Sequence, residues 1–322
     1  MRPVIRRIAH GLLLLLGVSI LSFVLTQLSP GEFFQEMRLN PQISPQTIAA
    51  LRARYGMDQP LASRYFHWLT SALRGDLGFS FAYNCPVGSL LRPRMVNTLI
   101  LAVPATLLAW LIAIPAGAWT AAHRGSWADR IAAAGTSTLL AIPDLVLALA
   151  LLLLAVRTGI FPTGGMFSVG HADLSPWGKA RDLALHMFLP GAALVLGALP
   201  TLVRHVRASM IEVLDAPFVR TALAHGIPRR RILWRQVLPA AANPLISLFG
   251  ISLGALISAS LLIEVIMSWP GLGPLVLEAV LARDVYLVIG AAVLSTAFLV
   301  AGNLFADLML CAADPRIRRE RA

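Results

Sequence analysis

The sequence predicts an all-α polytopic membrane protein with six transmembrane helices. Of its 322 residues, 57% are hydrophobic and only 13% are charged, which is not the composition of a soluble domain. Six apolar stretches have about the 20 residues that a helix needs to cross a hydrocarbon core of roughly 30 Å. They cover residues 9–28, 97–121, 131–156, 186–204, 240–264 and 285–310. We expect helices because strand-like alternation is absent and lipid tolerates no unpaired backbone.

The basic residues predict the orientation of these spans. If the N-terminus is cytoplasmic, the inner segments hold 16 of the 27 Lys and Arg residues and only five acidic residues. The outer segments are longer, and they hold the other 11 basic residues with nine acidic ones. Both termini are therefore predicted to be cytoplasmic. Topology and anionic lipid account for the formal net charge of +11, so no nucleic-acid partner is expected.

The first span is predicted to be an uncleaved anchor, because its apolar run of about 18 residues is too long for a secretory signal peptide. An exterior loop of roughly 65 residues follows, too long to be a mere connector. Residues 45–54 in this loop are predicted to form a short helix. A second, amphipathic helix is predicted because apolar residues recur there at helical spacing, namely Leu61, Tyr65, Trp68, Leu69 and Leu73. It either lies on the membrane surface or caps the outer face of the protein.

Few ionisable residues fall inside the predicted spans, where their cost normally indicates function. Asp144 follows Pro143 in the third span, and this proline can kink the helix and free backbone groups. Asp144 could satisfy those groups or line a water-filled path, and the sequence leaves both open. Glu264 and Asp307 lie near the ends of the fifth and sixth spans, where we expect interfacial, structural roles.

Patterns of catalysis and cofactor binding are missing from the sequence. The seven His residues form no His-Glu-x-x-His motif, and no Gly-x-Ser-x-Gly motif occurs. His205 and His225 are predicted to be ordinary surface residues. Around Lys179, which is the only Lys, Asp173 and Ala180 replace the Gly and the Ser or Thr of a phosphate-binding loop. The sequence therefore predicts no metal site, no cofactor and no enzymatic activity of its own.

One polar, Arg-rich segment, at about residues 205–239, lies between the fourth and fifth predicted spans. Pro217 can occupy the first turn of a helix, and residues 218–225 favour its continuation. Gly226 can adopt the left-handed C-terminal cap, and Pro228 prevents further helix. An ordinary basic cytoplasmic loop would explain the arginines but not the cap and its spacing. The segment is therefore predicted to carry a short helix that ends at Gly226.

This segment resembles the EAA loop of the inner-membrane permease subunits of bacterial ABC importers. The family form is Glu-Ala-Ala, three residues, Gly, nine residues, Ile, one residue and Leu-Pro. The Gly and the Leu-Pro match at the correct spacing, whereas Glu, the first Ala and Ile are replaced. The aligned residues are Arg220, Thr221, Ala222, Gly226, Gln236, Leu238 and Pro239. Arg-Thr-Ala followed by this Gly resembles the variant of the peptide and nickel branch.

Further landmarks of that branch extend the resemblance over nearly the whole chain. They are residues 74–78 (Arg-Gly-Asp-Leu-Gly), 97–99 (Asn-Thr-Leu), 268–273 (Ser-Trp-Pro-Gly-Leu-Gly) and 314–318 (Asp-Pro-Arg-Ile-Arg). The resemblance implies the type I importer permease fold in the bacterial inner membrane. It also implies an N-terminal anchor with its exterior loop, residues 1–94, and a five-helix permease core, residues 95–322.

The resemblance implies a subunit that forms half of an ATP-driven translocation pathway. Its implied partners are a homologous second permease, two ABC ATPase subunits and an extracytoplasmic solute-binding protein, all at the lipid bilayer. The implied cargo is di- or oligopeptides, with nickel chelates or other small solutes as the alternative. A self-contained secondary transporter would need inverted repeats or charge-coupled sites, and an intramembrane enzyme would need a convergent catalytic group. The sequence shows neither.

The resemblance also implies that residues 216–225 form a coupling helix in a cleft of a separate ATPase subunit. Phe218 and Leu223 would supply apolar contact there, and Arg220 a polar anchor. The ATPases would drag this helix when they close around ATP, so that the spans rock between inward-open and outward-open states. The predicted coupling residues are Ala216, Phe218, Arg220, Thr221, Ala222, Leu223, Gly226, Leu238 and Pro239. The predicted hinge and pathway residues are Pro143 and Asp144.

Overall fold

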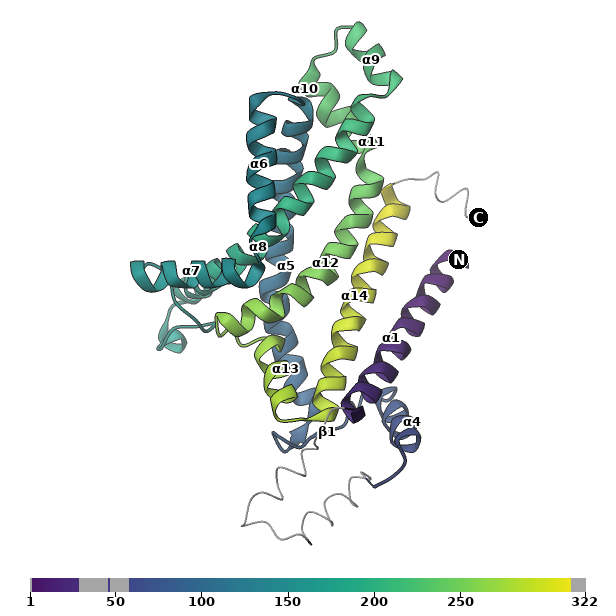
Figure 1. Ribbon diagram of the computed structural model, residues 1–322, viewed down its shortest axis with the longest axis vertical. Coiled ribbons are helices and arrows are strands. Elements are labelled where there is room, and N and C mark those ends of the chain that lie inside the picture. The colour runs from purple at the N-terminus through teal and green to yellow at the C-terminus, as the bar shows by residue number, and fades with distance from the viewer. Residues whose placement is uncertain (1, 29–45, 47–57, 314–322) are drawn as a thin grey trace. The chain divides into compact units, whose positions relative to one another are not determined.

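The protein is mostly helical in the computed structural model, which describes residues 2–28, 46 and 58–313 (Figure 1). The long helices are α1 (Arg2–Leu28), α5 (Val87–Ala122), α8 (Pro176–Leu214), α12 (Ala242–Ile266) and α14 (Val285–Ala313). The shorter helices are α4 (Leu61–Ala72), α6 (Trp127–Ala141), α7 (Asp144–Thr158), α9 (Pro217–Ala224), α10 (Arg229–Ile232), α11 (Leu238–Ala240) and α13 (Leu272–Leu281). A 3₁₀ turn covers His171–Asp173, and a π-helical turn covers Leu233–Val237. The predicted helix at residues 45–54 lies, except for residue 46, outside the described residues.

Five of the described helices, namely α1, α5, α8, α12 and α14, are long and apolar enough to cross a membrane. A sixth crossing results only if α6 and α7 are taken together, because the chain bends by 94° between them. The predicted third span, residues 131–156, is therefore not one continuous helix. Its break lies at Pro143, which has no backbone N–H and forces Ile142 into an extended conformation, with φ −86° and ψ 119°.

The fourth span is longer than the sequence predicts, since α8 has 39 residues and extends beyond residues 186–204 at both ends. Its start is fixed by Ser175, whose Oγ accepts a hydrogen bond from the Gly178 N–H at 3.2 Å, and by Pro176 in the first turn. Pro190 and Pro200 lie inside α8 without ending it. Proline alone therefore does not break these helices.

The chain divides into two compact units, which we describe separately. The first unit comprises Met1–Ile5, Thr98–Trp269 and Leu299–Ala322, and the second comprises Arg6–Asn97 and Pro270–Phe298. In the first unit, α8 packs against α6, α7 and α12. Helix α5 also approaches α8 closely at Gly117, where a Cβ would lie 2.6 Å from the side chain of Val206 of α8.

Helices α12 and α14 pack closely in the first unit because α12 has two glycines four residues apart. A Cβ at Gly250 would lie 2.2 Å from the Cβ of Ala306, and one at Gly254 would lie 1.9 Å from Leu299. Glycines with this spacing allow backbones to approach and are typical of packed membrane helices. A hydrogen bond joins α5 to α12, where Trp110 Nε1 donates to Ser252 Oγ at 2.8 Å.

Glu264 lies near the end of α12, where the sequence predicts an interfacial residue, but it is fully buried. Its Oε1 accepts a hydrogen bond from Ser260 Oγ at 3.2 Å, one helical turn earlier. This burial and this hydrogen bond fit the structural role that the sequence predicts for Glu264. Hydropathy alone misses this burial because it does not show which face of a helix other helices cover.

In the second unit, α4 has the amphipathic character that its spacing predicts. Trp68 of α4 packs with Phe23 of α1 and Ile289 of α14 in one buried cluster. Trp68 Nε1 also donates to the carbonyl of Leu77 at 3.0 Å. The apolar face of α4 is thus covered by helices of its own chain, which argues against a helix that only rests on lipid.

The second unit also contains a two-stranded antiparallel sheet of β1 (Phe79–Ser80) and β2 (Cys85–Pro86), with Phe79 opposite Pro86. Its turn is fixed by the buried carboxylate of Asp284, just before α14. Oδ2 of Asp284 accepts hydrogen bonds from Ser80 Oγ at 2.6 Å and from the Ala82 N–H at 3.0 Å. One carboxylate therefore holds segments that are about 200 residues apart in the sequence.

Candidate functional site

The predicted short cytoplasmic helix is α9, which begins at Pro217 and is followed by Gly226. Gly226 has a φ of 74°, a left-handed conformation that glycine adopts without strain. The Gly226 N–H donates to the carbonyl of Leu223 at 2.9 Å, and the Ile227 N–H donates to the carbonyl of Ala222 at 3.2 Å. This bond pair is a Schellman motif. The predicted helix and its glycine cap are both confirmed.

The two faces of α9 differ in what covers them. Val219 and Ala222 point into the first unit and are 2% and 9% exposed. Phe218 and Leu223 are 46% and 41% exposed, and Arg220 and Thr221 are exposed beside them. The helix thus presents two large apolar side chains and a guanidinium outward while two small apolar residues attach it.

Helix α8, which precedes α9, is attached to α6 by a buried carboxylate. Asp129 of α6 accepts two hydrogen bonds from Arg207 of α8, from Nε to Oδ1 and from Nη2 to Oδ2, each at 2.9 Å. The Gly125 N–H also donates to Asp129 Oδ2 at 3.0 Å. Such bidentate pairs have a fixed geometry. The last turns of α8 are thereby fixed to the α5–α6 turn, ten residues before α9 begins.

Arg124 and Asp215 form a second ion pair next to this one, with Nη1 and Oδ2 3.1 Å apart. Both side chains are mostly exposed, so this pair contributes little to stability. The end of α8 and the α5–α6 turn, which together form the base of α9, are therefore held together mainly by Asp129 and Arg207. These pairs could not be recognised from the sequence, because Asp129 and Arg207 are 78 residues apart and Arg124 and Asp215 are 91 apart.

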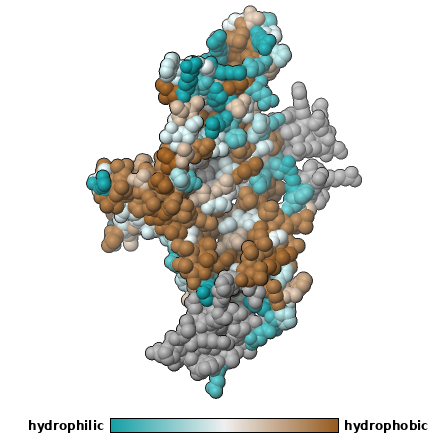
Figure 2. Space-filling view, viewed as in Figure 1, coloured by the Kyte–Doolittle hydropathy of each residue, from teal (hydrophilic) through white to brown (hydrophobic). Residues whose placement is uncertain are grey.

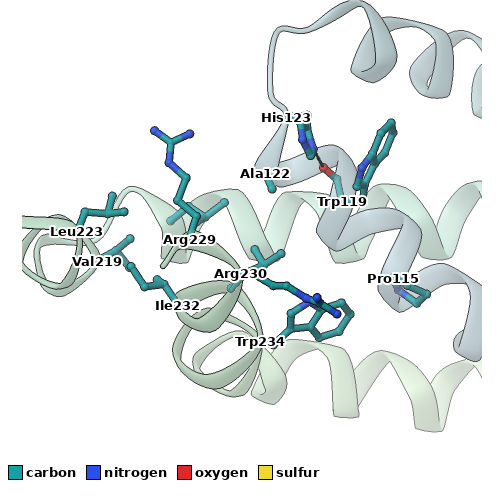
Figure 3. A pocket seen from close by; sticks show the side chains of 12 residues that line it. Pro115, Trp119, Ala122, His123, Val219, Leu223, Arg229, Arg230, Ile232 and Trp234 are labelled. Atoms are coloured by element: carbon teal, nitrogen blue, oxygen red, sulfur yellow. Dashed lines mark hydrogen bonds between the residues drawn. The ribbon is translucent and has the colours of Figure 1, made fainter. Parts of the chain in front are cut away.

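A groove of about 510 Å³ lies between the end of α5, the end of α8, α9 and the segment from α10 to the π-helical turn. Figure 3 shows Trp119 of α5 and His123 just after this helix on one side, and Arg230 and Trp234 on the other. Val219 and Leu223 of α9 form its end wall. Its complete lining is Pro115, Trp119, Ala122, His123, Leu214, Val219, Leu223, Arg229, Arg230, Ile232, Leu233 and Trp234.

The remaining residues of the predicted site lie elsewhere in the segment. Ala216 is the N-cap of α9 and makes no side-chain hydrogen bond. Leu238 and Pro239 lie in α11, where Leu238 packs against the core of the first unit and Pro239 is exposed. The turn before them is π-helical, a feature that often marks functional sites and that the sequence did not predict. His205 and His225 are exposed, as predicted.

Pro143 and Asp144 lie at the break between α6 and α7. Pro143 is the N-cap of α7, and Asp144, which is exposed, is its first residue. Asp144 lies against the backbone of α8, since a Cβ at Gly197 would be 2.7 Å from Asp144 Oδ1. Sequence reasoning missed Gly197, although an isolated glycine inside a span can indicate a close approach.

A carboxylate also holds the start of α8, which sequence reasoning missed. Asp182 accepts hydrogen bonds from the Ser168 N–H at 3.0 Å and Ser168 Oγ at 2.7 Å, and it contacts His171 Nδ1 at 2.7 Å. These contacts fix the segment before α8 to that helix. Among the residues that the structure describes, no group of three or more His, Cys, Asp or Glu could hold a metal ion.

These features match a family of transport proteins. Residues 113–319 match the family "Binding-protein-dependent transport system inner membrane component", and residues 1–107 match the N-terminal domain described for such components. The chain therefore belongs to this family. It is the permease subunit of an ABC importer and not itself an enzyme, because the ATPase resides in separate subunits.

Several relatives align over almost their full length. The oligopeptide transport system permease protein AppB of Bacillus subtilis is 34% identical over 98% of both chains. The dipeptide transport system permease protein DppB of Escherichia coli is 33% identical over 99% of both chains. The methionine ABC transporter MetNI in an inward-facing conformation shows a similar fold, with a TM-score of 0.54 at 18% identity over 70% of this chain and 96% of that chain.

Proposed function

We propose that this permease carries di- or oligopeptides and that α9 is the helix through which ATPase subunits move it. The observation that carries the coupling assignment is the outward pair of Phe218 and Leu223 on a helix that has a Schellman cap and a fixed base. The names of the full-length relatives support the choice of peptides. Nickel chelates and other small solutes are the second choice of cargo.

The proposal includes six membrane crossings, with α6 and α7 together as one, and cytoplasmic termini in a bacterial inner membrane. The distribution of Lys and Arg supports this orientation, since the segment that contains α9 holds seven arginines between Arg204 and Arg235. We further propose that residues 1–94 act as an anchor with an exterior loop and that residues 95–322 act as the permease core. About residues 205–239 then form the cytoplasmic coupling loop.

The proposed partners are a homologous second permease, two ABC ATPase subunits and an extracytoplasmic solute-binding protein, in the lipid bilayer. Phe218 and Leu223 enter an apolar cleft of an ATPase, and Arg220 pairs with an acidic or carbonyl group at its edge. Ala216, Thr221, Ala222 and Gly226 give the helix its shape, whereas Leu238 and Pro239 fix the return of the chain into α12. Apolar anchors with a flanking Arg are typical of tight protein contacts.

Movement reaches the spans through contacts that the first unit provides. The Asp129–Arg207 pair makes α6 and α8 move as one body when α9 is pulled. The break at Pro143 allows α7 to change its angle to α6, so this residue serves as the hinge. Asp144, which is exposed at the break, lines the pathway and offers a carboxylate to the amino group of a passing peptide.

The test is the capture of ATPase subunits by the permease in detergent or nanodiscs. The double variant Phe218→Ser with Leu223→Ser should lose at least about tenfold of the ATPase affinity, since each apolar anchor contributes about 1 kcal/mol or more. A matched control replaces Val280 and Leu281 of α13 by Ser, two apolar residues that are also exposed. Equal ATPase affinity of both double variants would contradict the coupling assignment.

A further inference from the structure

The groove beside α9 has an unusual chemical composition for a cytoplasmic surface. Most of its wall is apolar, two tryptophans lie in it, and Arg229 and Arg230 are at its rim. None of the 12 described residues that line it is acidic. Figure 2 shows hydrophilic residues gathered over α9 and α10, whereas the surface of α7 is hydrophobic. The groove thus combines apolar surface with positive charge and has no acidic residue in its lining.

The tryptophans indicate where the groove lies relative to a bilayer. Trp119 is three residues from the end of α5, a helix long and apolar enough to cross a membrane. Trp119 and Trp234 are 48% and 41% exposed and lie on opposite sides of the groove (Figure 3). Tryptophans are enriched at membrane–water interfaces, at the level of the lipid head groups, and Trp119 is near the end of such a spanning helix. The groove therefore opens where lipid phosphates are found.

A neighbouring shallow surface adds to the positive charge. It is lined by Pro228, Arg230, Arg231, Trp234 and Arg235, so it shares Arg230 and Trp234 with the groove. Guanidinium groups bind phosphate in a bidentate manner, and basic pockets beside cytoplasmic membrane helices attract anionic lipid. An apolar ligand without charge would use only the wall, whereas a free anion would use only the arginines.

We propose that this groove binds an anionic phospholipid. Its phosphate lies on Arg229 and Arg230, and the start of an acyl chain follows Trp119 and Leu233 toward the bilayer. Since Leu223 belongs both to the groove and to the outward face of α9, a bound lipid touches the proposed coupling helix. The binding of lipid stands without the coupling role, but its effect on transport rests on the proposed function.

The bound lipid fills the space between the end of α5 and α9 and thereby limits the movement of α9 relative to α5. The end of α5 and α9 line the groove from two sides. Only Val219 and Ala222 of α9 are buried against the rest of the unit, while the Schellman cap preserves the shape of this helix. Because the lipid occupies the space into which α9 would otherwise tilt, movement of the ATPase is passed on to α8 and is not lost in tilting of α9. An anionic membrane therefore supports coupling. Peptide uptake should therefore rise with the anionic fraction of the bilayer even when ATPase binding is unchanged.

The direct test measures lipid retained by the isolated full-length permease, with no ATPase present, by native mass spectrometry after exchange into phosphatidylglycerol or phosphatidylcholine. The double variant Arg229→Gln with Arg230→Gln should retain less phosphatidylglycerol, by roughly fivefold per arginine removed. Retention of phosphatidylcholine should not change. The matched control is Arg204→Gln, an exposed arginine of α8 outside the groove, which should behave as the wild type.

Three results would overturn the lipid proposal. The first is equal phosphatidylglycerol retention by the double variant and the wild type, and the second is equal retention of the two lipids by the wild type. The third is a photo-crosslinker at Trp234 that captures an acidic peptide of a partner subunit and no lipid in the assembled transporter. Loss of ATPase affinity in the Phe218 and Leu223 variants is measured separately, so failure of the coupling assignment is distinguishable.

Discussion

Two short apolar helices, α9 in the first unit and α13 in the second, are attached in different ways. The ends of α13 are held by side chains from distant parts of the chain. Asn97 Nδ2 donates to the carbonyl of Pro270 at 2.8 Å before the helix, and the buried Asp284 holds Ser80 after it. The ends of α9 are held by local backbone hydrogen bonds and by one exposed ion pair, Arg124 with Asp215.

This difference in attachment indicates a packing role for α13 and a mobile, partner-binding role for α9. Leu272, Leu275 and Ala279 of α13 are fully or almost fully buried, so this helix is part of the packing of its unit. Helix α9 buries only Val219 and Ala222 and keeps its own shape through its cap. A helix that must follow a moving partner needs a stable local shape and few ties to its own chain. The predictions below test this contrast by its effect on stability.

The largest loss of stability is expected from Asp284→Ala. The substitution leaves the buried hydroxyl of Ser80 and the partly buried N–H of Ala82 without their acceptor, which costs about 2–3 kcal/mol. Thermal unfolding in detergent should show a clearly lower midpoint. Asp284→Asn keeps one oxygen acceptor and should lose less. An unchanged midpoint for Asp284→Ala would mean that α13 is no more firmly attached than α9.

Arg207→Ala should cost somewhat less, about 1–2 kcal/mol, because it leaves the buried carboxylate of Asp129 with only the Gly125 N–H. The guanidinium of Arg207 is partly exposed, which limits the loss. A double-mutant cycle with Asp129→Ala should give a coupling free energy that differs from zero. Asp215→Ala, which breaks the exposed pair, serves as the control and should cost less than about 1 kcal/mol. If the losses of stability from Asp129→Ala and Arg207→Ala simply add, the two side chains do not hold α6 and α8 together.

Gly226→Val should cost about 1 kcal/mol or slightly more, because a β-branched residue is strained at a φ of 74°. Insertion into the membrane should stay intact, but ATPase association and transport should weaken. Gly226→Asn is the milder comparison, since Asn tolerates the left-handed region better. Normal transport by the Val variant would show that the shape of α9 does not matter for coupling.

The smallest effect is expected from Tyr83, which donates a hydrogen bond to Glu278 of α13. Burial, together with this hydrogen bond to Glu278, raises the pKa of Tyr83 to about 12. The protonated phenol therefore stabilises the fold fully below the unfolded-state pKa of about 10, and this contribution is lost as the pH rises toward 12. Tyr83→Phe should lower the unfolding midpoint slightly at pH 8, and the difference from wild type should shrink above pH 10. A difference that grows with pH would contradict the bond.

Local features of the site could be predicted from the sequence. Pro217 and Gly226 define α9 because a proline start and a glycine cap depend only on backbone conformation. Apolar length likewise predicts α12 and α14 closely and the existence of α1 and α5, although α5 begins ten residues before the predicted span; Pro143 indicated where the third span could bend. Each of these signals lies within one element of the chain.

Features that join distant segments could not be predicted. At the 94° bend Asp144 lies close to Gly197 of α8, and before α9 Asp129 pairs with Arg207. The partner of a charged residue does not follow from spacing, and neither does the covered face of a helix that is apolar all round. The burial of Glu264 could not be predicted for the same reason, since a position near the end of a span does not show that other helices cover it.

Photo-crosslinking along α9 in the assembled transporter tests the central claim most directly. A photoreactive amino acid at Phe218, Arg220 or Leu223 should capture an ATPase subunit, whereas the same probe at the inward-facing Val219 should capture this chain or the lipid in the groove but no ATPase. The yield from the outward positions should change when a non-hydrolysable ATP analogue is added. Capture of nothing but lipid or this same chain from the outward positions would show that α9 does not receive force from an ATPase.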